Sequence, residues 1–305
     1  MGGSPRVPVT GTEFEVWGCR GSRSLVPPRS TIGNHTSCYS LRSGADLLVL
    51  DAGRGLVALS SAVVSEPRFR AVRRVRVLVS HSHLDHWEGL KDAEWFWRKG
   101  RPLEVTIAGS AQALHAIRAA YGHPSYVTLD LLAAGTRCRV AYEELEADLD
   151  RRLGAWRVRT RPLYHYSGDE HARDFLDTLG FRVSAPDGAT VGYLCDHEPH
   201  TGSRDVERAL LEGAHLAVYD THWLHARHHA HGHGSIEHAA AMAREFRETL
   251  VLAGHHGPTR ADAEIGAAHR RYARGVSNFR LAVEGEAFRF VRARGFRARP
   301  HSSRH

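Results

Sequence analysis

Several residue types and patterns are scarce in this 305-residue sequence, and each absence narrows what the protein can be. Its four cysteines are widely spaced and form no CxxC pair, which argues against a disulfide framework and favours reduced thiols in a cytoplasmic protein. No run approaches the roughly 18 apolar residues of a membrane span. The first residues also lack the apolar segment of a secretory signal, so we expect neither membrane insertion nor secretion.

The motifs of several enzyme classes are also missing. The sequence has no Gly-X-Ser-X-Gly elbow, no P-loop and no internal repeat, so serine-hydrolase and NTPase interpretations have no support. Lysine occurs only at Lys91 and Lys99, and the net charge of +7 therefore comes from arginine. Arginine binds phosphate through paired hydrogen bonds, so a basic surface can attract an anionic substrate. For most of these arginines, genome composition and a solvated surface are the simpler explanation.

The stretch from residue 81 to residue 86 carries the clearest chemical signal. It reads His81-Ser82-His83-Leu84-Asp85-His86 and follows a β-branched run at 75–80 that is typical of a buried strand. In an extended chain His81 and His83 share a face, and Asp85 and His86 follow after a bend. Imidazole nitrogen and carboxylate oxygen are ligands that suit zinc, iron or manganese. Four such groups directly after a strand indicate a metal site.

Further histidines and aspartates stand where other apolar segments end. The segments 157–165, 190–196, 214–220 and 250–256 end in His165, Asp196, Asp220 and the pair His255-His256. Packing does not account for this recurrence, because the ends of unrelated strands need not carry metal-binding side chains. Metal-type ligands thus recur where apolar strands stop.

The spacing His-X-His-X-Asp-His is the signature of the metallo-β-lactamase superfamily, and this sequence resembles that family over roughly residues 12–260. The resemblance implies an α/β fold, the four-layered αβ/βα sandwich, with one or two metals at the edge between two β-sheets. The opening segments 18–22, 33–38 and 51–53 look like the phosphodiesterase and ribonuclease Z-like branch. His35 departs from that pattern, because those relatives carry asparagine there. The Gly/Pro-rich arm with which ribonuclease Z grips transfer RNA is not visible.

The resemblance also implies a ligand set for two divalent metal ions, with Zn²⁺ expected and Mn²⁺ or Fe as alternatives. One ion would be held by His81, His83 and His165, the second by Asp85, His86 and His255, and Asp196 would bridge both. His256 adjoins His255 and stays open as the alternative ligand. Asp85 and His233 are the expected catalytic residues.

His233 lies just before a predicted helix whose N-cap is Ser235, where free N–H groups and the helix dipole favour an anion. The stretch 232–235 resembles the Gly-His-Ser-Thr helix start of ribonuclease Z-like phosphodiesterases, in which the histidine contacts the scissile phosphate. Gly234-Ser235 replaces Ser-Thr here, and a loop histidine before an ordinary helix is the alternative. The remaining histidines between residues 222 and 231 match no motif, and we expect them in solvent.

The rest of the chain predicts one domain at 12–291 between loose tails at 1–11 and 292–305. We expect a hairpin around residues 43–46, a helix over 93–99 whose aromatic residues pack inside, and a helix over 111–121 capped by Ser110.

Together these patterns favour a binuclear metal-dependent hydrolase, a phosphodiesterase acting on a small phosphodiester such as a cyclic nucleotide. Two alternatives stay open. One is a hydrolase of another ester, such as a lactone or thioester, that uses the same metals. The other is a non-enzymatic metal or nucleic-acid binding protein that uses the arginine surface. We expect a small anionic substrate and no membrane partner, and the sequence allows a homodimer.

Overall fold

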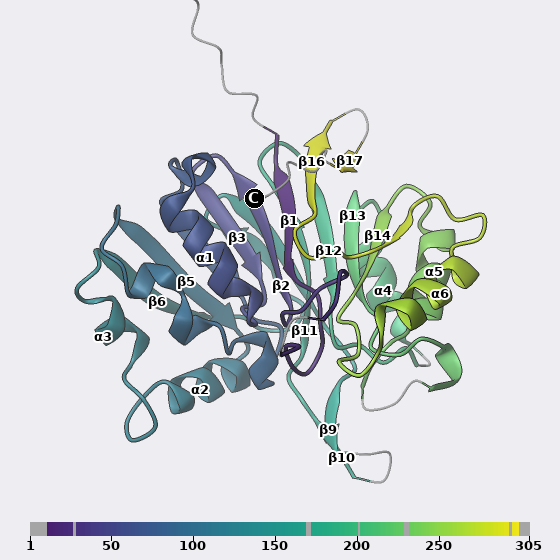
Figure 1. Ribbon diagram of the computed structural model, residues 1–305, viewed down its shortest axis with the longest axis horizontal. Coiled ribbons are helices and arrows are strands. Elements are labelled where there is room, and N and C mark those ends of the chain that lie inside the picture. Colours follow the sequence, from purple (N-terminus) through teal and green to yellow (C-terminus); the bar gives the residue numbers. More distant parts are fainter. Residues whose placement is uncertain are drawn as a thin grey trace, which may run out of the picture.

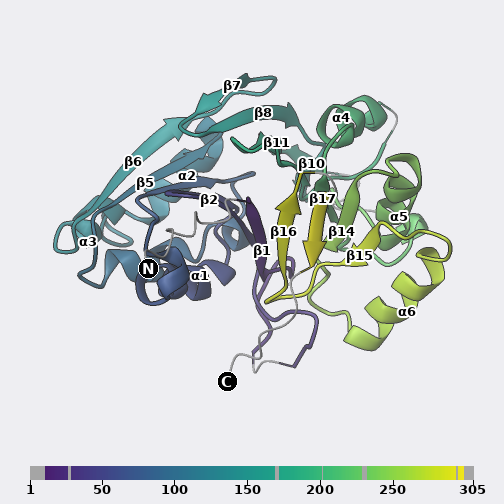
Figure 2. The same ribbon diagram turned by 90° about the horizontal axis from the view of Figure 1, so that it is seen from above.

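Two β-sheets lie face to face as the inner layers of the structure, and helices cover both outer faces (Figures 1 and 2). The computed structural model describes residues 11–26, 29–168, 172–200, 202–228, 232–292 and 295–298. Helices α1, α2 and α3 lie on the side of the first sheet, and α4, α5 and α6 on the side of the second. This is the four-layered sandwich that the sequence predicts.

The first sheet has the strand order β17-β16-β1-β2-β3-β4-β5-β6. Its strands are β1 Glu13–Gly18, β2 Cys38–Ser43, β3 Asp46–Leu50, β4 Arg74–Leu78, β5 Leu103–Gly109, β6 Cys138–Glu144, β16 Ala287–Val291 and β17 Gly295–Ala298. Strands β3 to β6 run parallel to one another. The β2–β3 hairpin turns at the predicted residues 43–46.

The second sheet has the strand order β15-β14-β13-β12-β11-β8-β7. Its strands are β7 Asp150–Leu153, β8 Trp156–Pro162, β11 Leu179–Ser184, β12 Thr190–Leu194, β13 Leu216–Asp220, β14 Leu250–Gly254 and β15 Phe279–Leu281. Strands β12 to β15 are parallel, so their carboxyl ends meet at one edge of the sheet. Strands β9 Tyr166–Gly168 and β10 Arg173–Phe175 form a separate hairpin that projects from the molecule (Figure 1).

The α-helices are α1 Gly55–Ser65, α2 Ala111–Ala120, α3 Leu129–Ala133, α4 Ser203–Leu211, α5 Ile236–Glu245 and α6 Asp262–Tyr272. Single 3-10 turns are η1 Pro67–Phe69, η2 Leu84–His86, η3 Leu90–Asp92, η4 Glu94–Phe96 and η5 Ala226–His228. Both predicted N-caps form, because Ser110 Oγ accepts from Ala113 N and Ser235 Oγ from His238 N. Among the helices described, none combines the length and apolarity needed to cross a bilayer.

Strand β3 shows how the sheets are held between apolar layers. Leu48 and Leu50 pack into the core shared by the two sheets, where Phe181 and Tyr193 also lie. Leu47 and Val49 point the opposite way, into the core beneath α1 and α2. Successive side chains of a strand alternate between faces, so both faces of this strand are buried. All four cysteines are likewise buried and free.

Three sequence-based expectations about these elements are wrong. Residues 93–99 form only the 3-10 turn η4, because Ala93 is extended and separates it from η3. Trp95 and Phe96 are buried as predicted, but Trp97 is 55% exposed. Residues 295–298, expected in a loose tail, form β17, whose Phe296 packs against Phe290. Residues 1–10, 293–294 and 299–305 of the expected tails lie outside the described residues.

Candidate functional site

The predicted site residues converge at the carboxyl ends of strands from both sheets. His81, His83, Asp85 and His86 follow β4 of the first sheet, and the last two lie in η2. In the second sheet, Asp196 follows β12 and His255 follows β14. Asp196 and His255 both have left-handed backbones, with φ of 55° and 53°. The left-handed residue ends each strand, and its side chain stays at the edge of the sheet.

The first group of possible metal-binding side chains contains His81, His83, His165 and Asp196. Asp196 Oδ2 lies 3.6 Å from His81 Nε2 and 3.4 Å from His165 Nε2. His83 joins them through Nδ1, which is 3.1 Å from His165 Nε2. Three imidazoles from two distant parts of the chain therefore face one carboxylate oxygen.

The second group surrounds the other oxygen of Asp196. Its Oδ1 lies 3.3 Å from His86 Nε2 and 3.2 Å from His255 Nδ1. Asp85 belongs here as well, because its Oδ2 is 3.3 Å from His86 Nε2. The Cys195 thiol, which the sequence analysis did not assign to the site, lies 3.4 Å from His255 Nδ1. Burial raises the pKa of this thiol well above its usual value, so it is a neutral neighbour in the absence of a cation.

Hydrogen bonds on the far side of the rings fix their orientation. His86 Nδ1 is 2.7 Å from Asp51 Oδ2, His165 Nδ1 is 2.8 Å from the Gly232 carbonyl, and His83 Nε2 is 2.8 Å from Ser167 Oγ. Histidines that bind metals usually have such a partner on the nitrogen that does not face the ion. None of these three partners was predicted from the sequence. Only Asp51 carried a local signal, an acid at a strand end.

The donor set fits divalent cations. The Nε2 atoms of His81, His86 and His255 are buried and make no hydrogen bond within the described residues. A buried polar atom without a partner is costly, and cations beside Asp196 would satisfy the Nε2 atoms of His81 and His86, whereas His255 faces Asp196 through Nδ1. Imidazole and carboxylate together suit zinc and manganese. The metallo-β-lactamase resemblance implies metal ions at this position.

His255 and His256 differ sharply in their surroundings. His255 lies beside Asp196, whereas the His256 ring faces away and is used elsewhere. Its Nδ1 is 3.1 Å from Thr221 Oγ1, and its Nε2 points toward the Ala282 carbonyl. Of the two neighbours, His255 is the one brought to the site.

His233 also reaches this site, held by an aspartate that the sequence analysis left without a function. His233 Nδ1 lies 2.9 Å from Asp220 Oδ2, at the end of β13. Burial disfavours a charged ring, but the carboxylates of Asp220 and Asp196 outweigh it and raise the pKa of His233 to about 9. The ring therefore carries a proton at neutral pH in the metal-free protein.

Three N–H donors around the start of α5 are not available to an anion. Gly234 N donates to Asp220 Oδ2, Gly232 N to Glu198 Oε2, and Ile236 N to the Trp223 carbonyl. These donors are already used within the protein. The His233 side chain is the group of this segment that remains placed to contact a ligand.

The histidines expected in solvent include two that are not. His222 stacks on His233 with ring centroids 4.3 Å apart and planes inclined by 14°, and its Nδ1 is buried without a partner among the described residues. His225 Nδ1 is 2.7 Å from the Tyr272 hydroxyl. The expectation is wrong for both, because His222 packs against His233 and His225 against Tyr272 of α6. Residues 229–231 lie outside the described part of the chain.

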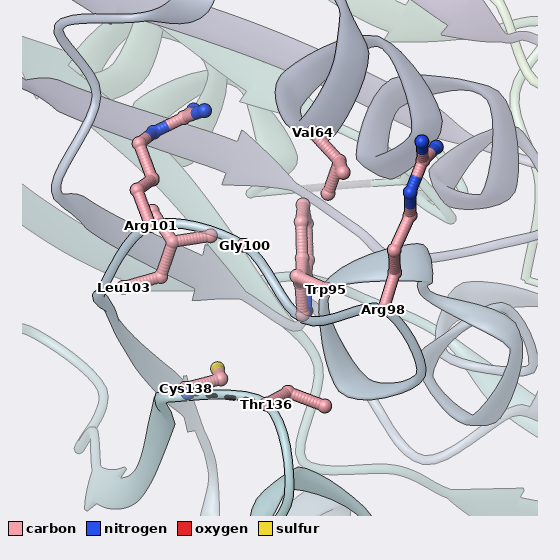
Figure 3. Close-up of a pocket in the computed structure, with 8 residues that line it drawn as sticks. All are labelled: Val64, Trp95, Arg98, Gly100, Arg101, Leu103, Thr136 and Cys138. Carbon is pink, nitrogen blue, oxygen red and sulfur yellow. Dashed lines mark hydrogen bonds between the residues drawn. The ribbon is translucent and has the colours of Figure 1, made fainter.

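A cavity of about 370 Å³ opens onto both groups. Its walls are made by Ser22, His83, Leu84, Asp85, His165, Tyr166, Ser167, Gly168, Asp196, His233 and His255. A separate cavity of about 20 Å³ lies beside Trp95 and Cys138 (Figure 3). It has room for a single water and is too small for a substrate.

Comparison with known proteins agrees with this architecture. The family model for the beta-lactamase superfamily domain matches residues 47–256, while none of the curated proteins matches the chain. Three similar solved structures cover almost the whole chain. The metallo-beta-lactamase fold protein YhfI from Bacillus subtilis has a TM-score of 0.65 at 18% identity, covering 92% of this chain and 99% of its own. Yeast PDE1 has a TM-score of 0.66 at 13% identity, covering 93% and 100%.

The third structure is a diphosphatase from the PhnP family, with a TM-score of 0.58 at 13% identity, covering 92% of this chain and 97% of its own. Identities this low establish a shared fold and leave the substrate open. The family match spans more than half of the chain and includes residues 81–86, His165, Asp196 and His255. The chain therefore belongs to the β-lactamase superfamily and has the metallo-β-lactamase fold.

Proposed function

We propose that this protein is a binuclear metal-dependent phosphodiesterase acting on a small phosphodiester such as a cyclic nucleotide. The observation that carries the proposal is the position of Asp196. One of its oxygens faces His81 and His165, and the other faces His86 and His255. A single carboxylate placed between two sets of imidazoles is suited to bridge two cations.

The residues would divide between the ions as follows. His81, His83 and His165 would hold one ion, Asp85, His86 and His255 the other, and Asp196 would contact both. Divalent cations in these positions supply Lewis acidity that lowers the pKa of water and offsets negative charge developing on a phosphoryl group. Asp51, Ser167 and the Gly232 carbonyl hold the imidazoles in place from behind.

The position of His233 favours a phosphodiester substrate over a neutral one. Asp220 bonds to its Nδ1, which leaves Nε2 as the nitrogen that can serve the cavity. A protonated His233 can stabilise a negatively charged phosphoryl group and donate its proton to the leaving oxygen. A lactone or thioester has less need of this cation. Similar structures that include a diphosphatase and yeast PDE1 point in the same direction.

The first test is metal analysis followed by a substrate panel. We expect about two ions per chain, activity that is abolished by a strong chelator, and recovery on adding zinc or manganese. The panel should contain a cyclic nucleotide, a nitrophenyl phosphodiester, a lactone and a thioester. Preferred hydrolysis of the phosphodiesters supports the proposal. Full activity in the metal-free protein, or turnover of only the lactone or thioester, contradicts it.

A further inference from the structure

The β9–β10 hairpin forms one wall of the cavity that contains Asp196. Tyr166, Ser167 and Gly168 of β9 line this cavity, and Ser167 touches His83 directly. The hairpin projects beyond the two sheets at the edge where the strand ends meet (Figure 1). A substrate bound at the two imidazole groups therefore lies next to the hairpin.

The hairpin and the residues beside it carry a group of aromatic rings, here called the aromatic platform: Tyr164, Tyr166 and Phe175. The ring centroid of Phe175 is 5.1 Å from that of Tyr164 and 5.9 Å from that of Tyr166, at interplanar angles of 60° and 66°. Phe175 nevertheless remains 56% exposed. Phe175 pairs with Tyr166 in the hairpin, and Tyr166 lines the cavity, so this exposed aromatic ring is suited to contact a ligand that extends from the cavity.

A cation accompanies these rings. The Arg173 guanidinium lies 4.8 Å from the centre of the Tyr166 ring, and its NH1 donates to the Tyr164 hydroxyl at 2.9 Å. Aromatic rings with an arginine beside a phosphate site are the combination with which proteins bind nucleotides, because every base offers a π-face and every phosphate a negative charge.

The aromatic platform is fixed to the rest of the site. The Tyr166 hydroxyl donates to Glu198 Oε2 at 2.7 Å, and the same oxygen accepts from Gly232 N at 3.0 Å. Glu198 is buried, and Gly232 directly precedes His233. One carboxylate thus ties the platform to the loop that carries His233. A base resting on the platform would have a defined position relative to the phosphate.

From these contacts we infer that Phe175, supported by Tyr164 and Arg173, forms a subsite for the aromatic base of a nucleotide. This inference rests on the proposed phosphodiesterase function and narrows its substrates to phosphodiesters that carry a nucleobase. Leu84, which is 58% exposed and also lines the cavity, gives the mouth a second apolar surface.

The test compares two ligands that differ only in the base. Adenosine 5′-monophosphate and ribose 5-phosphate are titrated by calorimetry into zinc-reconstituted protein. Base stacking is worth about 1–3 kcal/mol, so the nucleotide should bind roughly 10–100-fold more tightly than the sugar phosphate. Phe175→Ala should bring this ratio close to one without changing the affinity for ribose 5-phosphate. Phe175→Trp should preserve the ratio.

Trp97→Ala is the matched control, because Trp97 is equally exposed but follows η4, a segment that contributes none of the residues lining the cavity, whereas Phe175 packs on the lining residue Tyr166. It should leave both affinities unchanged. Equal binding of the two ligands to the wild type, or no binding of either, overturns the subsite. A nucleotide preference that survives Phe175→Ala overturns it too.

The experiments distinguish failure of the phosphodiesterase function from failure of the base subsite. If the protein hydrolyses none of the phosphodiesters but keeps a nucleotide preference that depends on Phe175, the subsite is supported while the phosphodiesterase function falls. If it hydrolyses simple phosphodiesters without any preference for the base, the function stands and the subsite is refuted.

Discussion

Ser167 Oγ lies 2.8 Å from Nε2 of His83, on the side of the ring that faces away from His165. The other ring nitrogen, Nδ1, is 3.1 Å from His165 Nε2 in the first imidazole group. The projecting hairpin therefore fixes which nitrogen of His83 is presented to the site. His83 is only partly buried, so packing alone constrains this ring less than those of His81 or His86.

This contact predicts that Ser167→Ala weakens metal binding. Losing the partner of a metal-binding histidine typically costs 10–100-fold in affinity, and we expect roughly that range here. Competition with a chelating dye measures it without reference to activity. Ser167→Thr keeps the hydroxyl and should keep the affinity, and Ser184→Ala, on β11, serves as the control. Unchanged affinity in Ser167→Ala would show that His83 is oriented by other contacts.

Asp196→Ala should lower occupancy at both metal positions. Its two oxygens face the two imidazole groups, so one substitution removes an oxygen from each. Elemental analysis after dialysis should give well below one ion per chain, with activity lost. Asp150→Ala, which changes a carboxylate paired with surface arginines, should retain the wild-type content. Loss of only one ion would mean that Asp196 does not bridge.

The neighbours His255 and His256 should behave differently. His255→Ala removes a ring beside Asp196 and should lose the second ion. His256→Ala breaks contacts with Thr221 and Ala282 and should keep both ions, at some loss of thermal stability. Metal content and circular dichroism of the two variants separate these effects. The opposite pattern of metal loss would exclude His255 as the ligand.

His233→Ala should keep the fold and both ions but slow cleavage of a cyclic nucleotide by roughly 10²–10⁴-fold, the usual loss for a general acid. The loss should be much smaller for a nitrophenyl phosphodiester, because nitrophenolate leaves without protonation. Asp220→Asn should show the same pattern more weakly, since it disturbs the partner of His233 Nδ1. Wild-type rates on both substrates would make His233 an ordinary loop residue.

His35 should make stability depend on pH. Its Nδ1 is 2.6 Å from Glu284 Oε1, and this hydrogen bond raises the pKa of His35 above the usual 6.5. A raised folded-state pKa means that the stabilisation is fully present below about pH 6.5 and is lost as pH rises through the folded value. Because His35 is 37% exposed, screening should limit the contribution to about 1 kcal/mol or less.

Chemical denaturation of the metal-free wild type and His35→Asn checks this prediction. The difference in unfolding free energy should be largest near pH 6 and shrink toward pH 9. Taking the difference between the two proteins cancels the titration of the other histidines, which both share. A difference that is constant with pH would show that the pair contributes no charge interaction.

The sequence by itself determined the fold and the main elements of the site. Apolar β-branched runs such as 75–80 predict strands from local pattern alone, and His81 to His86 follow one of them within six positions. Local sequence signals correctly predict the helix N-caps Ser110 and Ser235. The helix predicted at residues 93–99 is wrong, because Trp95 and Phe96 are buried without a regular helix and Trp97 is exposed.

Only the tertiary structure decided how these residues are combined. Asp196 faces two imidazole groups, Asp220 holds His233, and Ser167 holds His83, across separations of 13 to 84 residues in the last two cases. No local pattern encodes such contacts, because each depends on which strand ends and loops become neighbours when the two sheets pack. His222 illustrates the point: its sequence surroundings suggest solvent, yet the fold of its segment stacks it on His233.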